Sequence, residues 1–150
     1  MNEDEKWMQI AIDEAIQAKF ENEIPVGAIL IKDGEIIAQA HNQPILKNDP
    51  TAHAEIQVLR IAGEKLKNYR LNASTLYVTL EPCSMCLSAM MHARIERVVF
   101  GAYDSKSGVC GSCINLTNAN FFNHTVQSHG GVLETICSKL LKDFFKLKRR

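Results

Sequence analysis

The sequence has 150 residues, a hydrophobic fraction of 46% and no formal net charge, a composition typical of one globular domain. A chain of this length can bury about two-thirds of its unfolded surface, so it needs neither a metal nor a disulfide to fold. Its acidic first residues differ from a signal peptide, and no apolar run approaches the roughly 20 residues of a membrane helix. We therefore expect a cytoplasmic protein with no membrane segment, in which residues 1–150 form a single domain.

The cysteines and the charges are unevenly distributed. The five cysteines are an odd number, which in a reducing compartment favours metal binding or catalysis over disulfides. Residues 1–23 carry seven acidic and two basic side chains, whereas residues 139–150 carry six basic and one acidic. A basic end of this kind is either an anion-binding patch or the solvated end of a helix.

The first predicted elements are a helix and a hairpin. Apolar side chains recur at helical spacing from residue 4 to residue 16, with polar side chains between them. Residues 26–31 and 35–40 are apolar runs joined by Lys32-Asp33-Gly34, which predicts a strand, a tight turn and a second strand. Residues 42–51 contain two prolines and no periodicity, which predicts a loop.

A helix, a strand, a second helix and a second strand follow. Thr51 is suited to cap the first of these helices, which keeps an apolar face until residue 68. Residues 71–80 alternate with a period of two and predict a central strand. Pro82 fits the first position of the next helix, because its missing N–H costs nothing there. Residues 97–101 then predict a short buried strand.

The remainder of the chain is less regular. Residues 102–124 have no clear period, residues 125–127 predict a last short strand, and residues 132–148 predict a closing helix. Because helices and strands alternate along most of the chain, the predicted fold class is α/β. A hairpin feeds a sheet that is covered by helices on both faces.

Two stretches hold chemically distinctive residues: His53-Ala54-Glu55 and Pro82 to Cys86. One imidazole and two thiolates are the ligands of a catalytic zinc that keeps its fourth position open for water. Cys83 and Cys86 are three apart, so they share a helix face, and a helix start favours their thiolate form. Such a zinc lowers the pKa of water toward about 7 and makes hydroxide available, while Glu55 stays free to move protons. This pattern favours hydrolytic deamination.

The spacing of His53 and Glu55 needs a particular local geometry. Side chains two residues apart diverge on a regular helix. We expect both to lie in the first turn, so that each reaches a site beyond the helix end from a different side. If the strands that end at Ala40 and Leu80 are neighbours, both helices begin at the same edge of the sheet, where Asn42 also lies.

The sequence also contains a competing metal site and, in the closing helix, a candidate binding surface. Four cysteines (Cys83, Cys86, Cys110 and Cys113) could form a structural zinc site, but the 23 residues between the two pairs exceed the usual spacing of about 15 to 20. That site also leaves His53 and Glu55 unexplained, so we interpret Cys110, Cys113 and Cys137 as buried or incidental thiols. In the closing helix we expect one of its two adjacent phenylalanines to be packed and the other to be exposed among cations.

Taken together, the residues resemble a known family. His-Ala-Glu followed by Pro-Cys-x-x-Cys resembles the signature of the zinc-dependent nucleobase deaminases. The likeness extends over nearly the whole chain to the bacterial tRNA adenosine deaminases, in the cytidine and deoxycytidylate deaminase superfamily. It is carried by residues 24–28, 49–55, 76–83 and 97–102, and by Asp143-Phe144-Phe145 with the basic tail.

The resemblance implies a fold, an activity and partners. The implied fold is a cytidine-deaminase-like, three-layer α/β/α domain with a mixed central sheet of about five strands. The implied enzyme is a homodimer that hydrolyses the wobble adenosine in the tRNA anticodon stem-loop, on an arginine tRNA, to inosine. It would hold one Zn²⁺ per chain.

By motif position, the resemblance also implies residue roles. His53, Cys83 and Cys86 would bind zinc, Glu55 would shuttle protons, and Asn42 would contact the flipped nucleoside. The surrounding anticodon-loop nucleotides would be contacted by four further residues: Asp104, Lys106, Phe145 and Arg149. His124 is a further candidate, without an assigned role.

Other interpretations use the same residues differently. A deaminase of a free base or nucleotide, of the guanine or cytosine type, would share the central residues but would not need the basic tail. A non-enzymatic, zinc-stabilised RNA-binding module would work without Glu55. Asp104 is either a turn residue or an acceptor for a ribose hydroxyl, which would favour RNA over DNA.

Overall fold

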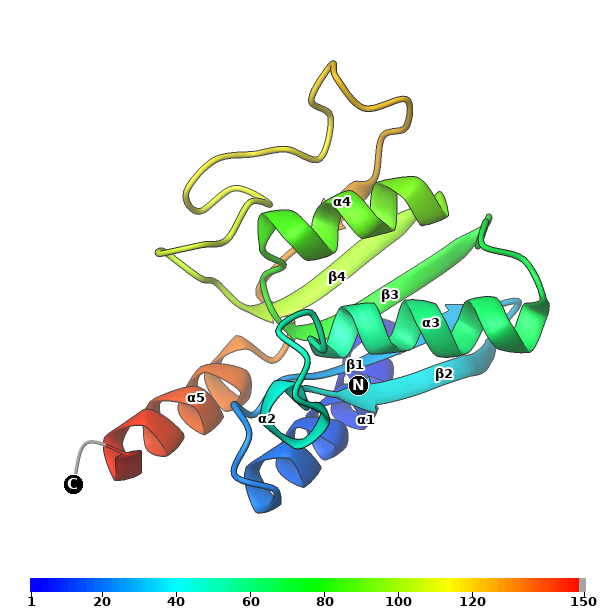
Figure 1. Cartoon of the computed structure of the whole chain (residues 1–150). Helices are drawn as coiled ribbons and strands as arrows, with labels where there is room; N and C mark the ends of the chain where they lie inside the picture. Colours follow the sequence, from blue (N-terminus) through cyan, green and yellow to red (C-terminus); the bar gives the residue numbers. More distant parts are fainter. Residues whose placement is uncertain (149–150) are drawn as a thin grey trace.

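A computed structural model describes residues 1–148 of the chain (Figure 1). Helices and strands alternate, as the sequence pattern predicts. In chain order the elements are α1 (Glu3–Phe20), β1 (Gly27–Lys32), β2 (Glu35–His41), α2 (Pro44–Lys47), α3 (Ala54–Leu66), β3 (Ser74–Leu80), α4 (Ser84–Ala93), β4 (Arg97–Ala102), β5 (Gln127–His129) and α5 (Glu134–Lys148). Within these residues no helix is long and apolar enough to cross a membrane.

The five strands form one mixed sheet in the order β2-β1-β3-β4-β5. Strand β1 is antiparallel to both β2 and β3, whereas β4 is parallel to β3 and to β5. The condition that β2 and β3 are neighbours is not met, because β1 lies between them. Since β1 is antiparallel to both, β2 and β3 still run in the same direction. The helices that follow them therefore begin at the same edge of the sheet.

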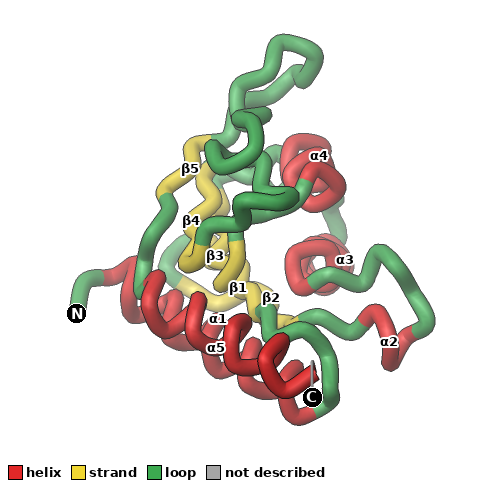
Figure 2. The backbone as a smooth tube through the Cα atoms, turned by 90° about the vertical axis from the view of Figure 1, so that its left-hand side faces the viewer, coloured by secondary structure: helices red, strands yellow, loops and turns green. Residues whose placement is uncertain are grey.

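Helices cover both faces of the sheet, which confirms the three-layer α/β/α architecture (Figure 2). Helices α3 and α4 pack on one face around Leu76, Val78 and Val98. Helices α1 and α5 pack on the other face around Ile29, Tyr77 and Val99. Strand β3 is thus buried on both sides, although its alternating sequence resembles a half-exposed strand, because α1 covers the face that carries Tyr77.

Several predicted boundaries move for local reasons. The predicted loop at 42–51 contains the short helix α2, whose first amides, from Ile45 and Leu46, donate to the buried carboxylate of Glu23. Strand β3 starts at Ser74 rather than residue 71, because Ala73 has a positive φ of 57° that ends the preceding turn. Helix α5 starts two residues later than predicted, after Leu133 with a φ of 52°.

The segment between β4 and β5 is a long irregular loop, which the sequence left without an assignment (Figure 1). A single bridge between Cys110 and Asn115 gives part of it a hairpin-like form. The last strand lies at 127–129 rather than 125–127, where Gln127 and His129 pair with the start of β4. The loop passes the edge of the sheet at which α3 and α4 begin.

Candidate active site

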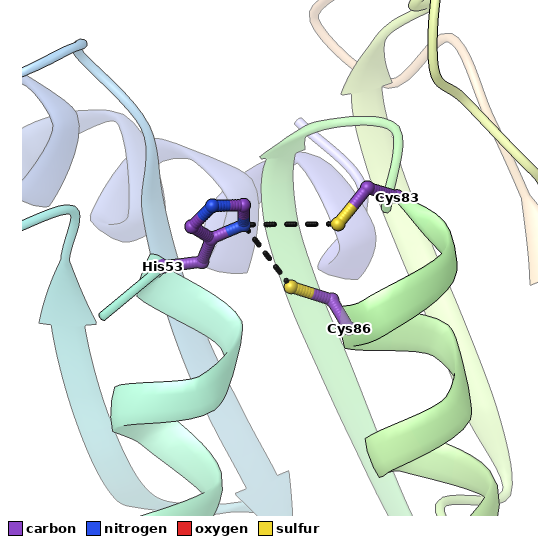
Figure 3. A group of neighbouring side chains, drawn as sticks. All are labelled: His53, Cys83 and Cys86. Atoms are coloured by element: carbon purple, nitrogen blue, oxygen red, sulfur yellow. Dashed lines mark hydrogen bonds between the residues drawn. The ribbon is translucent and has the colours of Figure 1, made fainter. Parts of the chain in front are cut away.

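The predicted metal ligands meet where α3 and α4 begin, beyond the carboxyl end of β3 (Figure 3). His53 is the N-cap residue of α3, and Cys83 is the N-cap residue of α4. The prediction that Thr51 caps α3 is wrong, because the amide and hydroxyl of Thr51 both donate to Asp49 instead. Pro82 precedes the cap of α4 rather than opening the helix. Both helices therefore start two residues later than predicted, which places His53 and Cys83 at their ends.

The three ligand atoms lie at distances suited to a shared metal. His53 Nδ1 is 3.7 Å from Cys83 Sγ and 3.4 Å from Cys86 Sγ, and all three atoms lie within 4.8 Å of one another. In a tetrahedral zinc site, bond lengths near 2.0 and 2.3 Å place nitrogen and sulfur ligands about 3.5 Å apart. The donor set and its spacing therefore fit zinc, with three protein ligands.

The competing four-cysteine site does not form. Within residues 1–148, the only group of three or more close His, Cys, Asp or Glu ligands is the triad of His53 and the two cysteines of α4. Cys110 and Cys137 are buried, as expected, whereas Cys113 is exposed and its thiol donates to the Ser105 carbonyl. Burial raises the pKa of both Cys110 and Cys137 to about 12, which keeps them as unreactive thiols.

The three ligand side chains shift one another's pKa values, and the shift of Cys83 favours binding of a cation. The Cys86 thiol donates to Cys83 and lowers the pKa of Cys83 to about 4, with a further contribution from His53. The same hydrogen bond, together with burial, raises the pKa of Cys86. The hydrogen bond between His53 and Cys83 raises the pKa of His53. The contacts of Cys83 favour its thiolate form, which is the form that binds a metal.

Glu55 supplies the carboxylate beside the triad. It lies in the first turn of α3 and is only 4% exposed. Burial raises its pKa to about 7. A carboxyl group with a pKa near neutrality can both accept and return a proton, which suits general acid–base chemistry. Glu55 lies in the first turn as expected, whereas His53 is the N-cap residue just before that turn rather than within it.

Asn42 is buried against the start of α3. Its Oδ1 accepts a 2.7 Å hydrogen bond from the Ala54 amide, so Asn42 provides the side-chain cap that Thr51 does not. This contact fixes the orientation of the amide group, because only oxygen can accept. Within the described residues, Nδ2 has no protein partner, and Asn42 lines a cavity next to the triad.

The cavity beside the triad has a volume of about 140 Å³. It is smaller than the roughly 300 to 1,000 Å³ of sites that enclose drug-sized ligands, so it suits one flat ring. Two wider depressions, of about 540 and 300 Å³, share residues with its mouth. The walls of the small cavity are formed by Ile24, Val26, Asn42, His53, Glu55, Leu80, Glu81, Cys83, Asp104 and Ser107.

Glu81 is a wall residue that the sequence analysis missed. It is 2% exposed, and its carboxylate accepts hydrogen bonds from the amides of Asp104, Cys110 and Ser112, and from the Ser112 hydroxyl. It therefore holds the loop after β4 against the cavity. The sequence does place an acidic residue directly between an apolar strand and Pro82. An acidic residue at such a position is usually interpreted as part of a turn.

The predicted nucleotide-contacting residues lie around the wider depressions. Asp104, Lys106 and Phe145 line the larger one. The Asp104 carboxylate accepts from the amides of Lys106 and Ser107, so it has the turn role as well. Phe144 is 7% and Phe145 is 42% exposed, which confirms one packed and one exposed ring. Arg149 lies outside the residues that the structure describes.

His124 is placed away from the triad. One ring nitrogen donates to the Ile95 carbonyl at 2.7 Å. Ile95 follows the last turn of α4, whereas the triad lies at its first turn. The structure therefore gives His124 a local role in holding the long loop to the end of α4.

Comparison with known proteins gives one consistent result. The sequence profile of the MafB19-like deaminases matches residues 2–149. The tRNA-specific adenosine deaminase of Haemophilus influenzae is 48% identical over 97% of this chain and 85% of its own. That of Bacillus subtilis is 45% identical over all of this chain and 93% of its own.

Solved structures add two neighbours. A protein from work on A-to-I editing by tRNA deaminases at the wobble position is 40% identical, with a TM-score of 0.88 over 91% of this chain and 99% of its own. Guanine deaminase from Bacillus subtilis is also 40% identical, with a TM-score of 0.64 over 69% of this chain and 66% of its own.

Proposed function

The chain belongs to the MafB19-like deaminase family, and we propose that it hydrolyses the wobble adenosine in the anticodon loop of a tRNA, an arginine tRNA, to inosine. The observation that carries the proposal is the meeting of a zinc-type triad, a buried glutamate and a base-sized cavity at one edge of the sheet. In this proposal residues 1–150 form one zinc-dependent deaminase domain.

His53, Cys83 and Cys86 hold the metal in this proposal, one ion per chain. When bound, the metal would supply Lewis acidity, which lowers the pKa of a water molecule and so provides a nucleophile at neutral pH. Three protein ligands leave one position for that water, as catalytic rather than structural zinc sites do. The spacing of the three ligand atoms supports this role.

Glu55 moves the protons of the reaction. Adenosine and water give inosine and ammonia, so the water must lose its protons and the amino group must gain one. Glu55 accepts a proton from the water, passes it to a ring nitrogen, and then delivers the next one to the departing amino group. Its burial beside the cavity and its pKa of about 7 support this shuttle.

Asn42 orients the base. With Oδ1 engaged by the Ala54 amide, its Nδ2 hydrogens are the groups available to an acceptor on the nucleoside. The small cavity accommodates one base but no stacked neighbours, so the target nucleotide has to leave the stack before it enters.

The outer residues bind the rest of the anticodon loop. Phe145 offers a partly exposed ring on which an unpaired base can stack, and Lys106 lies beside it in the same depression. Asp104 accepts from a ribose hydroxyl, and Arg149 adds a cation near the phosphates. An Asp104→Asn variant with an unchanged preference for RNA over DNA would contradict the role of Asp104.

The enzyme acts in the cytoplasm as a homodimer in this proposal. Both properties are what the resemblance in sequence implies. Light scattering tests the homodimer directly. A mass of one chain, 16.8 kDa, at the concentration used for activity would contradict the dimer.

A second candidate is the deamination of a free purine base. The guanine deaminase neighbour, 40% identical, favours it, and the small cavity by itself admits a lone base. This activity would use the triad and Glu55 but not the exposed ring and cations of α5. A truncation after Leu141 separates the two candidates, because only the tRNA activity should depend on the removed residues.

The deciding experiment incubates the zinc-loaded protein with an anticodon stem-loop of an arginine tRNA that carries a wobble adenosine. Inosine at that position is the expected product. A stem-loop with the adenosine moved by one nucleotide is the control. Free adenosine, guanine and cytidine are run in parallel, and ammonia release from one of these without inosine in the stem-loop would favour the second candidate.

A further inference from the structure

We propose that His41 is a positioning residue for this reaction: held between Glu14 and Glu21, it fixes Asn42 in the orientation that caps α3 and faces the base cavity. The inference rests on the proposed function where it assigns Asn42 to the base. His41 is the last residue of β2, directly before Asn42. It touches neither the triad nor the cavity, so its effect has to pass through its neighbour.

The ring of His41 is held at both nitrogens. Nδ1 lies 2.8 Å from Glu14 Oε1, and Nε2 lies 3.0 Å from Glu21 Oε2. The His41 side chain is only 14% exposed, and those of Glu14 and Glu21 are 16% and 34% exposed. Both acids belong to α1, Glu14 within the helix and Glu21 as its C-cap residue. The contact therefore ties the end of β2 to the end of α1.

Two glutamines complete the arrangement. Gln39 donates to the second oxygen of Glu14 at 2.8 Å, and Gln43 donates to the second oxygen of Glu21 at 2.9 Å. Residues 39 and 41 alternate along β2, so both side chains point to the α1 face. Gln43 follows β2, and besides its contact with Glu21 its Oε1 accepts from Gln57 of α3 at 3.1 Å. Each of the four carboxylate oxygens thus has one partner among residues 39, 41 and 43. We call Glu14, Glu21, Gln39, His41 and Gln43 the β2 clamp.

The ring bridges Glu14 and Glu21. Each of its two nitrogens contacts one carboxylate, so a side chain with a single polar end on this side cannot hold both acids at once. From α3, Gln57 donates to the His41 carbonyl at 2.6 Å. The end of β2 is therefore held from both sides.

The position of Asn42 follows from the clamp. Since His41 points to α1, Asn42 directly after it points to the opposite face, toward α3 and the cavity. The Asn42 amide donates to the Val26 carbonyl at 3.0 Å, and its side chain accepts from Ala54 at 2.7 Å. A shift of the β2 end would weaken this cap and turn Nδ2 away from the base.

The first test replaces His41 by a neutral residue that cannot bridge both acids. In His41→Asn the KM for the stem-loop should rise about tenfold with little change in kcat, because a binding group has moved and the triad has not. Amide hydrogen exchange at Ala54 should become faster as its cap weakens. This second readout does not depend on the identity of the substrate.

Two control variants separate positioning from general destabilisation. Asp4→Asn removes an ion pair to Arg97 at the opposite end of the sheet, and His129→Asn removes an exposed histidine on β5. Neither should change KM or exchange at Ala54. If Asp4→Asn, at equal loss of thermal stability, raised KM as much as His41→Asn, the positioning role would be wrong.

A rescue variant tests the bridge between the two acids. Arginine in His41→Arg can donate to both acids at once, so KM and exchange at Ala54 should return toward the wild-type values. If His41→Arg kept the raised KM of His41→Asn, the bridge would not be what positions Asn42. Absence of inosine with the wild-type protein would instead count against the proposed function, and the Ala54 exchange test would still decide the clamp.

Discussion

The inner and outer parts of the candidate site are held in different ways. The inner part consists of His53, Glu55, Cys83 and Cys86, which lie at two helix starts and are mostly buried. The outer part consists of Asp104, Lys106 and Phe145, which lie on a turn and on the last helix and are partly exposed. Helix starts position the inner side chains, whereas in the outer part only Asp104 is held, by the amides of Lys106 and Ser107.

This difference separates chemistry from substrate choice. Buried groups with shifted pKa values perform proton transfer best when they cannot move. Exposed rings and cations can adapt to a nucleic acid at low cost. This chain is similar both to tRNA adenosine deaminases and to a guanine deaminase, so variants of the outer part are the ones that test substrate choice.

Among the variants that test the difference between the inner and outer parts, loss of a proposed metal ligand should have the largest effect on activity. In Cys83→Ala we expect zinc content to fall far below one ion per chain and inosine formation to fall to background, because no other group replaces the thiolate. The chain should stay folded, since its core is large enough without a metal. Metal analysis measures the zinc content, and circular dichroism measures whether the chain is folded. Cys113→Ala, which removes an exposed thiol, should keep its zinc and its activity, and an unfolded Cys83→Ala chain would show that the metal holds the fold.

Removal of the proton shuttle should have the next largest effect. Glu55→Ala should lower kcat by about 10² to 10⁴-fold, the range typical of general acid–base groups, with zinc content and stem-loop affinity unchanged. Glu64→Ala, on the exposed side of the same helix, is the matched control. Retained turnover in Glu55→Ala would favour a different proton carrier. Complete retention of RNA binding together with lost turnover would contradict a purely binding role for the protein.

Much of the fold follows from local patterns, but the sheet order does not. Alternation and the Asp33-Gly34 turn predict the β1–β2 hairpin, and both faces of the sheet were expected to be covered. The insertion of β1 between β2 and β3 depends on pairings such as Ala28 with Val78, fifty residues apart in sequence. No local period encodes such a pairing, so the order of the strands stayed open at the level of the sequence.

The site shows the same limit at the level of single residues. Spacing within motifs predicted the triad and Glu55, because the metal dictates which side chains must converge. The helix starts were misplaced, because Asp49 engages Thr51 and Asn42 caps α3 from outside the helix. Glu81 and His41 were missed for a similar reason. Each is an isolated polar residue whose partners lie far away in the sequence.

The exposed aromatic ring gives a prediction for the outer part alone. Phe145→Ala should weaken stem-loop binding by about 10 to 100-fold, since base–aromatic stacking contributes about 1 to 3 kcal/mol per base. Fluorescence anisotropy measures the Kd. Leu147→Ala, also exposed on α5, is the control. Zinc content and any activity on free bases should not change, and a loss of zinc in Phe145→Ala would show that the two parts are not independent.

The smallest expected effect on the site comes from the ion pair at the opposite end of the sheet. Asp4 accepts from both terminal nitrogens of Arg97, at 3.0 and 2.7 Å, and from the Tyr77 hydroxyl at 2.7 Å. These contacts, with Arg97 the largest, lower the pKa of Asp4 below its ordinary 3.8. A lowered pKa stabilises the fold above pH 3.8, and this contribution is lost as pH falls through the folded value.

Asp4→Asn should therefore lower the free energy of unfolding by about 1 kcal/mol at pH 7 and by less near the acid end of the range. Urea unfolding at several pH values measures the difference. Because Asp4 and Arg97 lie at the starts of α1 and β4, at the edge away from the triad, KM and kcat at pH 7 should stay at wild-type values. A change in kcat would mean that the inner part depends on the packing of the whole sheet rather than on the two helix starts that hold it.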